Sequence, residues 1–379
     1  MLNQLIETLR LISAETPWLF PLCLGLMGAC VGSFLNVVIY RAPRGISLAD
    51  PARSFCPSCK VPIPWYFNIP LLSWWMLRGR CARCKTPISF RYWLVETATA
   101  LLFAALAWLY DIEGLPTQLL LCGWAACAVA MFAIDCEQMI VLPGLALLAA
   151  AFGLGAVSLS PWLIDPECMY AGDAAVLGLA GAVAGFLLLK ATALIGRLLF
   201  GRKRKEFKPG SPWNLRESPG GEDIVLMLPD GERRWSETFL EASDRLYLDE
   251  AALVLGGKKR AEGTLVFTQE AIEAPNGEVF RLEDWDKAGG TCARLRLRRE
   301  AMGSGDAWIT LAVGALCGWQ GALFSLAAGS VFGIFWGIAT RVGCGKPMPF
   351  GPFMLAAAFV WLAGGREWWN AWIALVSTS

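Results

Sequence analysis

The stretch AGDAAVLGLAGAVAGFLLLKATALIGRLLF, residues 171–200, decides the class of fold. Asp173, Lys190 and Arg197 are its only charged side chains. Since about 20 predominantly apolar residues in a helix cross the ~30 Å hydrocarbon core of a bilayer, this stretch predicts a membrane-spanning helix. The whole chain is 56% hydrophobic and 17% charged, whereas about a quarter of the residues in a soluble protein carry charge. The sequence therefore predicts an integral membrane protein.

Similar apolar segments recur along the chain, and eight of them are predicted to be spans. They are 18–40, 92–110, 117–135, 139–160, 171–200, 306–320, 321–341 and 349–364. The connections between 117–135 and 139–160 and between 306–320 and 321–341 are short, so the number of spans could differ from eight by one or two. The first is expected to be an uncleaved helix, because no basic flank and small-residue cleavage site accompany it. The expected fold is an all-α polytopic membrane protein with about eight transmembrane helices.

One region departs from this composition. Residues 201–300 hold 18 of the 33 Lys and Arg residues and 19 of the 32 Asp and Glu residues. The apolar residues of this region form short alternating runs such as GTLVFT and ARLRLR, and Pro275-Asn276-Gly277 is typical of a hairpin turn. We expect a small, soluble, β-rich insert that starts with a Pro/Gly/Ser-rich linker at 208–221.

The distribution of basic residues predicts the orientation, because cytoplasmic loops retain Lys and Arg. Residues 41–91 carry nine of them against the single Asp50, which predicts a cytoplasmic loop, and alternation places the insert on the same side. The expected organisation is an N-terminal segment with the first helix (1–40), a cytoplasmic cysteine loop (41–91), helices two to five (92–200), the insert (201–300) and helices six to eight (301–379).

Two CxxC pairs lie in the first loop, and they consist of Cys56, Cys59, Cys81 and Cys84. Each pair can place two thiolates on one tetrahedral metal, and four thiolates complete a structural zinc site. Disulfides are the weaker explanation in a reducing cytoplasm. Because a site of four cysteines has no open coordination position, a structural zinc ion is favoured over a catalytic metal.

The chain has no histidine. This excludes Ser-His-Asp triads, Cys-His nucleophiles and HExxH zinc proteases, so any catalysis must use carboxylates, thiols, lysines or a cofactor. The net charge of +1 indicates no nucleic-acid partner.

Acidic residues at the ends of apolar spans are costly and are functional hypotheses by default. By the charge bias, Asp135 at the end of the third span and Asp306 at the start of the sixth share the cytoplasmic edge, whereas Asp173 lies at the opposite face. Two carboxylates in a cleft of low dielectric share a proton, one acting as a base on water and the other as an acid. The alternative is that both are ordinary interfacial groups, with Asp306 capping its helix.

A series of motifs recurs in a fixed order along the chain: GSFLNVVIYR (32–41), the CPSC and CARC pairs, RYWLVE (91–96), IDCEQMIVLP (134–143), REAMGSGD (299–306), GALCGWQGA (314–322) and PFGPF (349–353). In this order they resemble the motifs of the type IV prepilin peptidases. The resemblance implies an inner-membrane aspartic protease of the GxGD class. Such enzymes cut the short basic leader from prepilins and pseudopilins at a Gly–X bond on the cytoplasmic side. Asp135 and Asp306 match the two catalytic aspartates of the family.

The resemblance also implies a second activity, because many members methylate the new N-terminal amine with S-adenosylmethionine. It puts the methyl-donor site near the first cytoplasmic loop, although no glycine-rich nucleotide loop after a strand is visible in the sequence. The implied partners are prepilin or pseudopilin substrates and the lipid bilayer.

Three features depart from the family pattern. Gly144 stands where members often carry an acidic or amide residue, Trp308 replaces the usual Lys, and the insert at about 201–298 replaces a short connection. These departures leave two alternatives: a divergent member with weak peptidase activity, and a non-enzymatic membrane scaffold for pilus or secretion assembly. Glu137 is expected to attract the basic leader, and Glu96 to orient or pack a helix.

Overall fold

The computed structural model describes residues 15–50, 53–110, 114–199, 202–218, 223–239, 244–256, 258–281, 288–298, 305–340 and 348–377. The chain forms two compact units. The helical unit comprises Met1–Leu189, Gly305–Val342 and Met348–Ser379, and the insert unit comprises Lys190–Ser304 with Gly343–Pro347.

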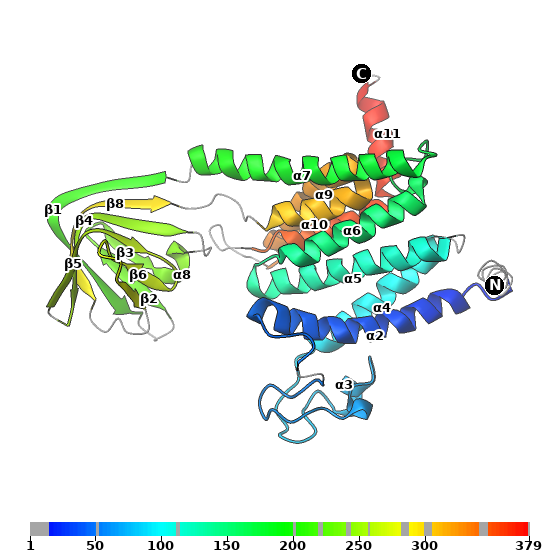
Figure 1. Cartoon of the computed structure of the whole chain (residues 1–379), viewed down its shortest axis with the longest axis horizontal. Coiled ribbons are helices and arrows are strands. Elements are labelled where there is room, and N and C mark those ends of the chain that lie inside the picture. Colours follow the sequence, from blue (N-terminus) through cyan, green and yellow to red (C-terminus); the bar gives the residue numbers. More distant parts are fainter. Residues whose placement is uncertain are drawn as a thin grey trace. The chain divides into compact units, whose positions relative to one another are not determined.

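Long apolar helices lie side by side in the helical unit (Figure 1). The helices of the membrane body are α2 (Leu19–Arg41), α4 (Arg91–Leu109), α5 (Leu115–Gln138), α6 (Pro143–Leu159), α7 (Ala171–Leu199), α9 (Asp306–Thr340), α10 (Gly351–Val360) and α11 (Arg366–Ser377). Within the described ranges, α2, α4, α5, α7 and α9 are long and apolar enough to cross a membrane, and α6 is apolar but shorter. The protein is therefore a multi-pass membrane protein. The described residues contain five helices that could each cross a membrane, and the expected number of eight spans stays a prediction.

The segment 306–341 was predicted to form two spans divided after residue 320. In the structure, α9 consists of two helical segments that meet at a kink at Gly318, where φ is 69° and ψ is −176°, so the helix is interrupted close to the predicted boundary. Glycine adopts this left-handed conformation at little cost, because it has no β-carbon. A single glycine is therefore enough to bend the helix, and the sequence has no polar loop that would mark the bend.

Helices α7 and α9 cross with almost no side chain between their backbones. A β-carbon on Gly181 of α7 would lie 2.6 Å from the carbonyl carbon of Gly318, and one on Gly314 would overlap the backbone oxygen of Gly181. Small residues allow this approach in a bilayer, where helix association depends on packing. Nearby, the rings of Phe186 and Trp308 are 4.9 Å apart, so the start of α9 is packed against α7.

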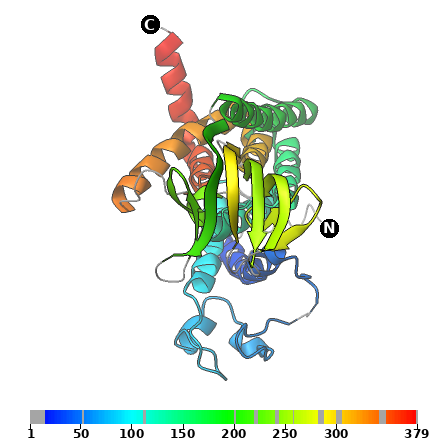
Figure 2. The same cartoon turned by 90° about the vertical axis from the view of Figure 1, so that its left-hand side faces the viewer.

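The insert unit contains one antiparallel sheet of eight strands in the order β3-β2-β1-β8-β4-β5-β6-β7. The strands are β1 (Arg202–Glu217), β2 (Ile224–Leu228), β3 (Gly231–Arg234), β4 (Arg245–Leu255), β5 (Lys258–Phe267), β6 (Ala271–Glu273), β7 (Val279–Arg281) and β8 (Gly289–Arg298), with the short helix α8 (Trp235–Thr238) after β3. Figure 2 shows these strands in green to yellow. Trp213, Leu226, Leu246, Phe267 and Leu295 are buried in the core of the sheet. The predicted β-rich insert is confirmed, and so is its hairpin, because β6 and β7 pair across Pro275-Asn276-Gly277.

The prediction of a linker at 208–221 is wrong for most of this segment. Strand β1 runs through it to Glu217, and its last three residues lie outside the described part of the chain. The pairing of β1 with β8 shifts register between Glu206 and Ser211, and Gly210 has a φ of 81°. The Pro and Gly residues therefore form an irregularity within a strand, which is a recurrent use of glycine in sheets.

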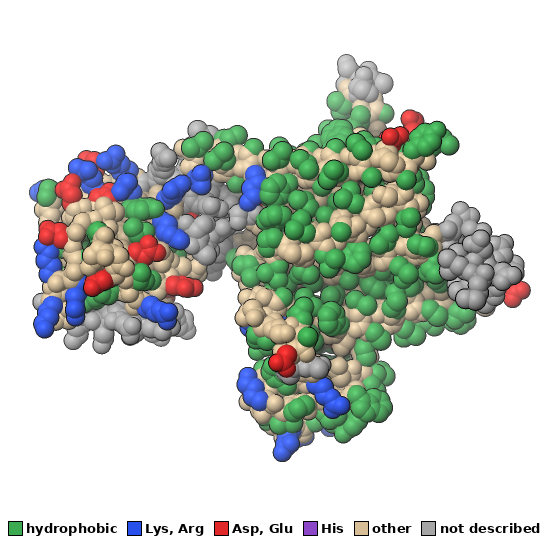
Figure 3. Space-filling view, viewed as in Figure 1, with side chains coloured by type: hydrophobic (Ala, Val, Ile, Leu, Met, Phe, Trp, Pro, Cys, Tyr) green, Lys and Arg blue, Asp and Glu red, His purple; other side chains and the backbone are tan. Residues whose placement is uncertain are grey.

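Side-chain chemistry separates the two units. Hydrophobic side chains cover the visible face of the helices, whereas Lys, Arg, Asp and Glu gather over the insert (Figure 3). Large apolar side chains such as Leu101, Ile334 and Phe335 are more than 60% exposed. This surface is the one expected of helices that face lipid.

Candidate active site and metal centre

Asp135 lies in the last turn of α5 and is only 5% exposed. Its Oδ2 atom is buried and has no hydrogen-bond partner in the described part of the chain. Gly351, the first residue of α10, lies against this carboxylate, since a β-carbon on it would be 2.6 Å from Oδ2 and would overlap Cδ1 of Ile309. A buried carboxylate oxygen without a partner is costly, which favours a functional role over a structural one.

The end of α5 is set by the residues that follow Asp135. Met139 adopts the left-handed conformation with φ 54°, and its amide donates a hydrogen bond of 2.9 Å to the carbonyl of Asp135. The chain is then extended at Leu142, and α6 begins at Pro143. Proline fits the first turn of a helix, where its missing amide hydrogen has no partner to lose. Asp135 is thus held on a short, irregular junction between two helices.

Asp306 is the first residue of α9. Gly305, directly before it, packs on this same junction, because a β-carbon on Gly305 would be 2.9 Å from Cγ2 of Val141. Ile309, one turn after Asp306, contacts the glycine that lies against Asp135. The structure therefore brings the two aspartates to the same end of the helical unit through two separate contacts.

Gly144 and Trp308, the two positions near the aspartates that differ from the family pattern, have different surroundings. A β-carbon on Gly144 would meet nothing within 4 Å, so the larger residue that the family often has would fit in this structure. Trp308 instead has a packing role, since its ring lies edge-on to Phe186 at 62°. The usual lysine could not make this aromatic contact.

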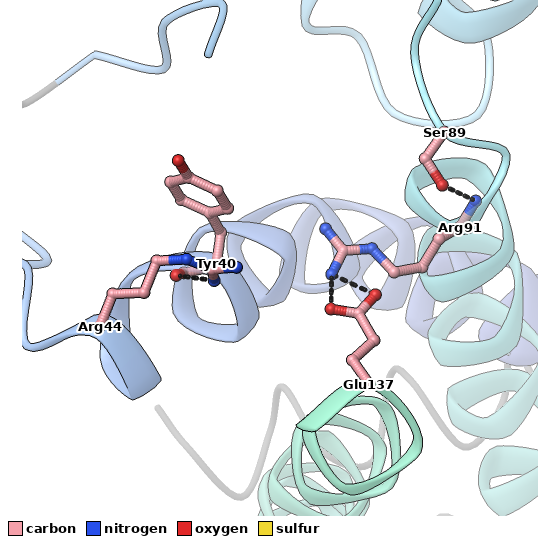
Figure 4. A network of polar contacts seen from close by, with 5 residues as sticks. All are labelled: Tyr40, Arg44, Ser89, Arg91 and Glu137. Atoms are coloured by element: carbon pink, nitrogen blue, oxygen red, sulfur yellow. Dashed lines mark hydrogen bonds and ion pairs between the residues drawn. The ribbon is translucent and has the colours of Figure 1, made fainter. Parts of the chain in front are cut away.

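Glu137 forms an ion pair with Arg91, the first residue of α4 (Figure 4). Nη1 of Arg91 lies 2.7 Å from both carboxylate oxygens of Glu137, and the amide of Arg91 donates to Oγ of Ser89. The Arg91 and Glu137 side chains are 18% and 37% exposed. The expectation that Glu137 attracts a basic leader needs revision, because Arg91 already neutralises the carboxylate and joins α4 to the end of α5.

The four cysteines of the first loop lie together. Their sulfur atoms are all within 4.8 Å of one another, and Sγ of Cys56 is 3.7 Å from Sγ of Cys84. A tetrahedral Zn²⁺ with Zn–S bonds of about 2.3 Å requires sulfur atoms about 3.8 Å apart. The donor set therefore fits a structural zinc ion.

Two matching turns build this centre. Cys56 accepts from the amide of Lys60, and Cys81 accepts in the same way from the amide of Lys85. Both lysines have a left-handed backbone conformation, with φ of 58° and 59°. The sequence repeat CxxCKxPI, at 56–63 and 81–88, encodes both turns and went unnoticed in the sequence reasoning. A hydrogen bond with the Thr86 side chain lowers the pKa of Cys84 to about 6, and this favours the thiolate that a metal binds.

Glu96 joins this loop to the membrane body. Its Oε2 atom accepts a hydrogen bond of 2.7 Å from the amide of Leu71, a non-glycine residue with φ 65°. Glu96 thus positions the loop on α4, which extends the orienting role expected for it.

A polar pocket lies between α2, α4 and the cysteine loop. Two adjoining cavities of about 90 and 370 Å³ share Ser33, Val37, Arg41, Ser54 and Asn68 as lining residues. Asn36 and Glu96 also line the smaller one.

Asn36 is the unusual residue of this pocket. It is 4% exposed, its Nδ2 donates to the carbonyl of Tyr92, and its Oδ1 has no partner within the described ranges. Arg41, also 4% exposed, donates to the carbonyls of Ser47 and Leu48 and so shapes the wall. Nearby, the Arg44 guanidinium lies 4.4 Å from the Tyr40 ring centroid and donates to the Tyr40 carbonyl (Figure 4). An asparagine in an apolar span was a signal for this site that the sequence reasoning passed over.

Two family models match the chain. One, described as the bacterial peptidase A24 N-terminal domain, matches residues 26–110 and includes the four cysteines. The other, described as the type IV leader peptidase family, matches residues 287–338 and includes Asp306. Asp135 lies in neither matched range.

Several curated relatives carry the name prepilin leader peptidase/N-methyltransferase. The protein from Myxococcus xanthus (strain DK1622) is 40% identical over 195 residues, which cover 49% of this chain and 51% of that protein. The protein from Stutzerimonas stutzeri is 34% identical over 49% of this chain and 80% of its own length, and the one from Klebsiella pneumoniae is 37% identical over 52% and 86%. The chain thus spans about half the length of the first relative and at least four fifths of the other two. No solved structure matches the chain. On the matched families and the coverage of these relatives, the chain belongs to the type IV leader peptidase family of enzymes.

Proposed function

We propose that the protein is a membrane aspartic endopeptidase that removes the basic leader from type IV prepilins or pseudopilins. Cleavage would occur at a Gly–X bond on the cytoplasmic side of the inner membrane. The observation that carries the proposal is the pair of contacts, Gly305 with Val141 and Gly351 with Asp135, that bring Asp135 and Asp306 to one end of the helical unit. The names of the relatives support the substrate class.

The chemistry needs only the two carboxyl groups and a water molecule. The ionised aspartate takes a proton from water as the water oxygen bonds to the carbonyl carbon of the Gly–X peptide. The protonated aspartate gives its proton to the carbonyl oxygen. The tetrahedral species then collapses and the C–N bond breaks. The leaving amine takes a proton from the first aspartate, and one hydroxyl group of the tetrahedral carbon returns a proton to the second aspartate as the new carboxyl group forms. Both aspartates are regenerated with one proton between them, and no histidine is required.

The cytoplasmic side rests on the charge bias of the first loop. Nine Lys and Arg residues against one acid in residues 41–91 support this orientation. The apolar surface of the helical unit suits a substrate whose helix lies in the bilayer, with its basic leader outside the hydrocarbon.

Asn substitution of each aspartate tests the peptidase. Asp135→Asn and Asp306→Asn keep the side-chain shape, remove the proton chemistry, and should each lower the cleavage rate of a prepilin in proteoliposomes by at least 10³-fold. Asp173→Asn, near the start of α7, is the matched control and should cleave normally. Normal cleavage by either site variant would refute the assignment.

We propose that the polar pocket of the first loop serves the second activity, methylation of the new N-terminus. S-adenosylmethionine would supply a methyl group from its sulfonium centre. The unpartnered Oδ1 of Asn36 can accept a hydrogen bond from a ligand amine, and the Glu96 carboxylate supplies negative charge beside a cationic ligand. The zinc centre would stiffen the wall, because Phe55 and Pro57 flank Cys56 and line the pocket.

The two activities can be separated by one variant. Asn36→Leu should lower transfer from a labelled methyl donor at least tenfold and leave leader removal unchanged, since Asn36 is remote in sequence from both aspartates. Ser330→Leu, on an exposed position of α9, is the matched control. If Asn36→Leu transfers methyl normally, the pocket is not the donor site, whatever the peptidase does.

A further inference from the structure

Helix α11 has its aromatic and its polar side chains on different faces. Residues three and four positions apart lie on one face of a helix. Trp368, Trp369 and Trp372 therefore share a face, which we call the aromatic face, and Glu367 and Asn370 share another. Trp368 and Trp372 are 75% and 57% exposed, so the described part of the chain leaves much of the aromatic face uncovered.

Helix α11 is too short to cross a bilayer. Its 12 residues extend about 18 Å at about 1.5 Å per residue, whereas the hydrocarbon core is about 30 Å thick. Its first two residues, Arg366 and Glu367, are charged, and charge within the hydrocarbon is costly. Helix α11 therefore lies outside the centre of the bilayer.

Helix α11 begins at the end of the helical unit that is opposite the aspartates. Helix α6 begins at the junction after Asp135, so the turn that follows α6 lies at the other end. Arg366 reaches this turn and donates hydrogen bonds of 3.1 and 3.3 Å to the carbonyls of Trp162 and Leu163. These bonds hold the first turn of α11 at that end of the unit.

Exposed aromatic residues mark this end as a membrane–water interface. Helix α5 ends close to Asp135, so its start and the end of α4 lie here. Helices α2 and α4 are antiparallel, because Gly25 contacts Ala104 and Gly32 contacts Glu96, and this places the start of α2 here as well. The exposed aromatic residues next to the ends of α4 and α6 and the starts of α2 and α7 are Trp18, Trp108, Trp162 and Tyr170. Trp and Tyr are enriched at the level of the lipid headgroups.

Helix α11 runs along the level of this interface. Figure 1 shows it across the direction of α5 and α7, and Figure 2 shows it along its length. Gly364, with φ 122°, turns the chain out of α10. The Trp369 ring lies edge-on to Phe324 of α9, with 6.3 Å between the ring centroids. The aromatic face therefore begins against the membrane body, and Trp368 and Trp372 continue it beyond the body.

We infer that α11 is an interfacial helix whose aromatic face is inserted among the lipids of the bilayer surface opposite the aspartates. An amphipathic helix of this kind lies in the plane of the interface, with its apolar face about 5–10 Å deep. The indole ring suits this depth because it has an apolar body and a polar N–H group. The charges of Arg366 and Glu367 cancel and α11 has no other charged residue, so the partner is the glycerol and upper acyl region of the lipids and not an anionic headgroup. The inference does not depend on the peptidase or on the methyl transfer.

Site-specific labelling of the full chain in phosphatidylcholine nanodiscs tests the inference. p-Azidophenylalanine replaces Trp368, Trp372 or Asn370, one at a time, and two reactions are measured on the α11 peptide by mass spectrometry. Under ultraviolet light, the azides at positions 368 and 372 should crosslink to lipid at least fivefold more than the azide at position 370. In the dark, a sulfonated cyclooctyne dissolved in the water should modify the azide at position 370 at least fivefold faster than the other two.

A carboxylate placed on either face of α11 gives a matched pair of variants. Trp372→Glu should lower the lipid yield from the azide at position 368 at least threefold. Asn370→Glu adds the same charge to the polar face and should leave this yield unchanged, and phosphatidylglycerol nanodiscs should give the same yield as phosphatidylcholine. Thermal unfolding in detergent checks that the variants are folded.

Three results would overturn the inference. The first is an equal lipid yield at the three azide positions, or an undiminished yield in Trp372→Glu. The second is crosslinking from position 368 mainly to another chain in nanodiscs that hold two copies, which would make the aromatic face a protein interface. The third is strong lipid crosslinking without cyclooctyne reaction at all three positions, because α11 would then be buried in the hydrocarbon.

Discussion

Gly305 and Val141 are in contact so closely that a β-carbon on the glycine would lie 2.9 Å from Cγ2 of the valine. This contact joins the residue before Asp306 to the junction that follows Asp135. The Val141 side chain leaves no room for a β-carbon at position 305, so this position requires glycine as long as residue 141 is valine.

Gly305→Ala is therefore expected to displace the start of α9 and to lower prepilin cleavage about tenfold or more, since small misplacements of catalytic groups have large effects on rate. The rate is measured in proteoliposomes. Shortening the opposing side chain should restore it, so the double variant Val141→Ala, Gly305→Ala should cleave within about threefold of the parent. Failure of this rescue would mean that Gly305 matters for another reason.

Gly351→Ala should be more severe, because the new methyl group meets the Asp135 carboxylate and Ile309 at once. We expect a loss of about 10²-fold or more in the turnover rate, with the protein still inserted in the membrane. Gly337→Ala is the control, since a β-carbon there would meet nothing within 4 Å. If the two variants cleave equally well, the contact between Gly351 and Asp135 has no role in catalysis.

Zinc removal should affect the two proposed activities differently. Phe55 and Pro57, the neighbours of the zinc-site residue Cys56, line the pocket of the first loop, whereas both aspartates lie on the helices. Cys56→Ser and Cys81→Ser are each expected to lower the zinc content, measured by atomic absorption, from about one ion per chain towards zero. Methyl transfer should fall by at least tenfold and cleavage by no more than about threefold. Equal losses would show that the loop also supports the aspartates.

The ion pair between Arg91 and Glu137 gives a test by double-mutant cycle. Partly exposed pairs contribute about 0.5–1 kcal/mol, so Arg91→Gln and Glu137→Gln should each lower stability by about that amount, and the double variant should be no worse than either. Thermal unfolding in detergent gives these values. If Glu137 instead reads a basic leader directly, its variant would raise KM for the prepilin even when Arg91 is already Gln.

The insert should lose stability in acid. Burial acts to raise the pKa of Asp249, but hydrogen bonds from Arg296 and Thr264 outweigh it and leave the pKa below its ordinary value. Because the folded pKa is the lower one, the stabilisation is full above the unfolded pKa of about 3.9 and is lost as the pH falls through the folded value. Hydrogen exchange of β4, corrected for the intrinsic rate, should therefore accelerate below about pH 4. Asp249→Asn should reduce this pH dependence, whereas Glu262→Gln, on an exposed residue, should not.

Charge in an apolar background was the most informative feature of the sequence. Asp135 and Asp306 stand out because burying a charge is costly, and the cysteines stand out because they are clustered. In the structure, the two aspartates lie at the same end of the helical unit and the four cysteine sulfur atoms lie within 4.8 Å of one another. The glycines that hold the aspartates did not stand out, since glycine is frequent in membrane helices and its partners, Val141 and Ile309, are distant in sequence. Local sequence patterns also fail to predict strands whose partners are distant in the sequence. The Pro/Gly/Ser-rich segment at 208–221 was predicted to be a linker because its partner strand, β8, lies more than 70 residues away.

The first and last strands of the insert unit, β1 and β8, pair with each other. Adjacent strands lie about 4.8 Å apart, so the domain receives the chain and returns it at almost the same point. The helices on either side, α7 and α9, are independently held together by Gly181 and Gly314. Excision of the insert unit should therefore leave α7 and α9 joined by their own contacts, and the helical unit should still assemble.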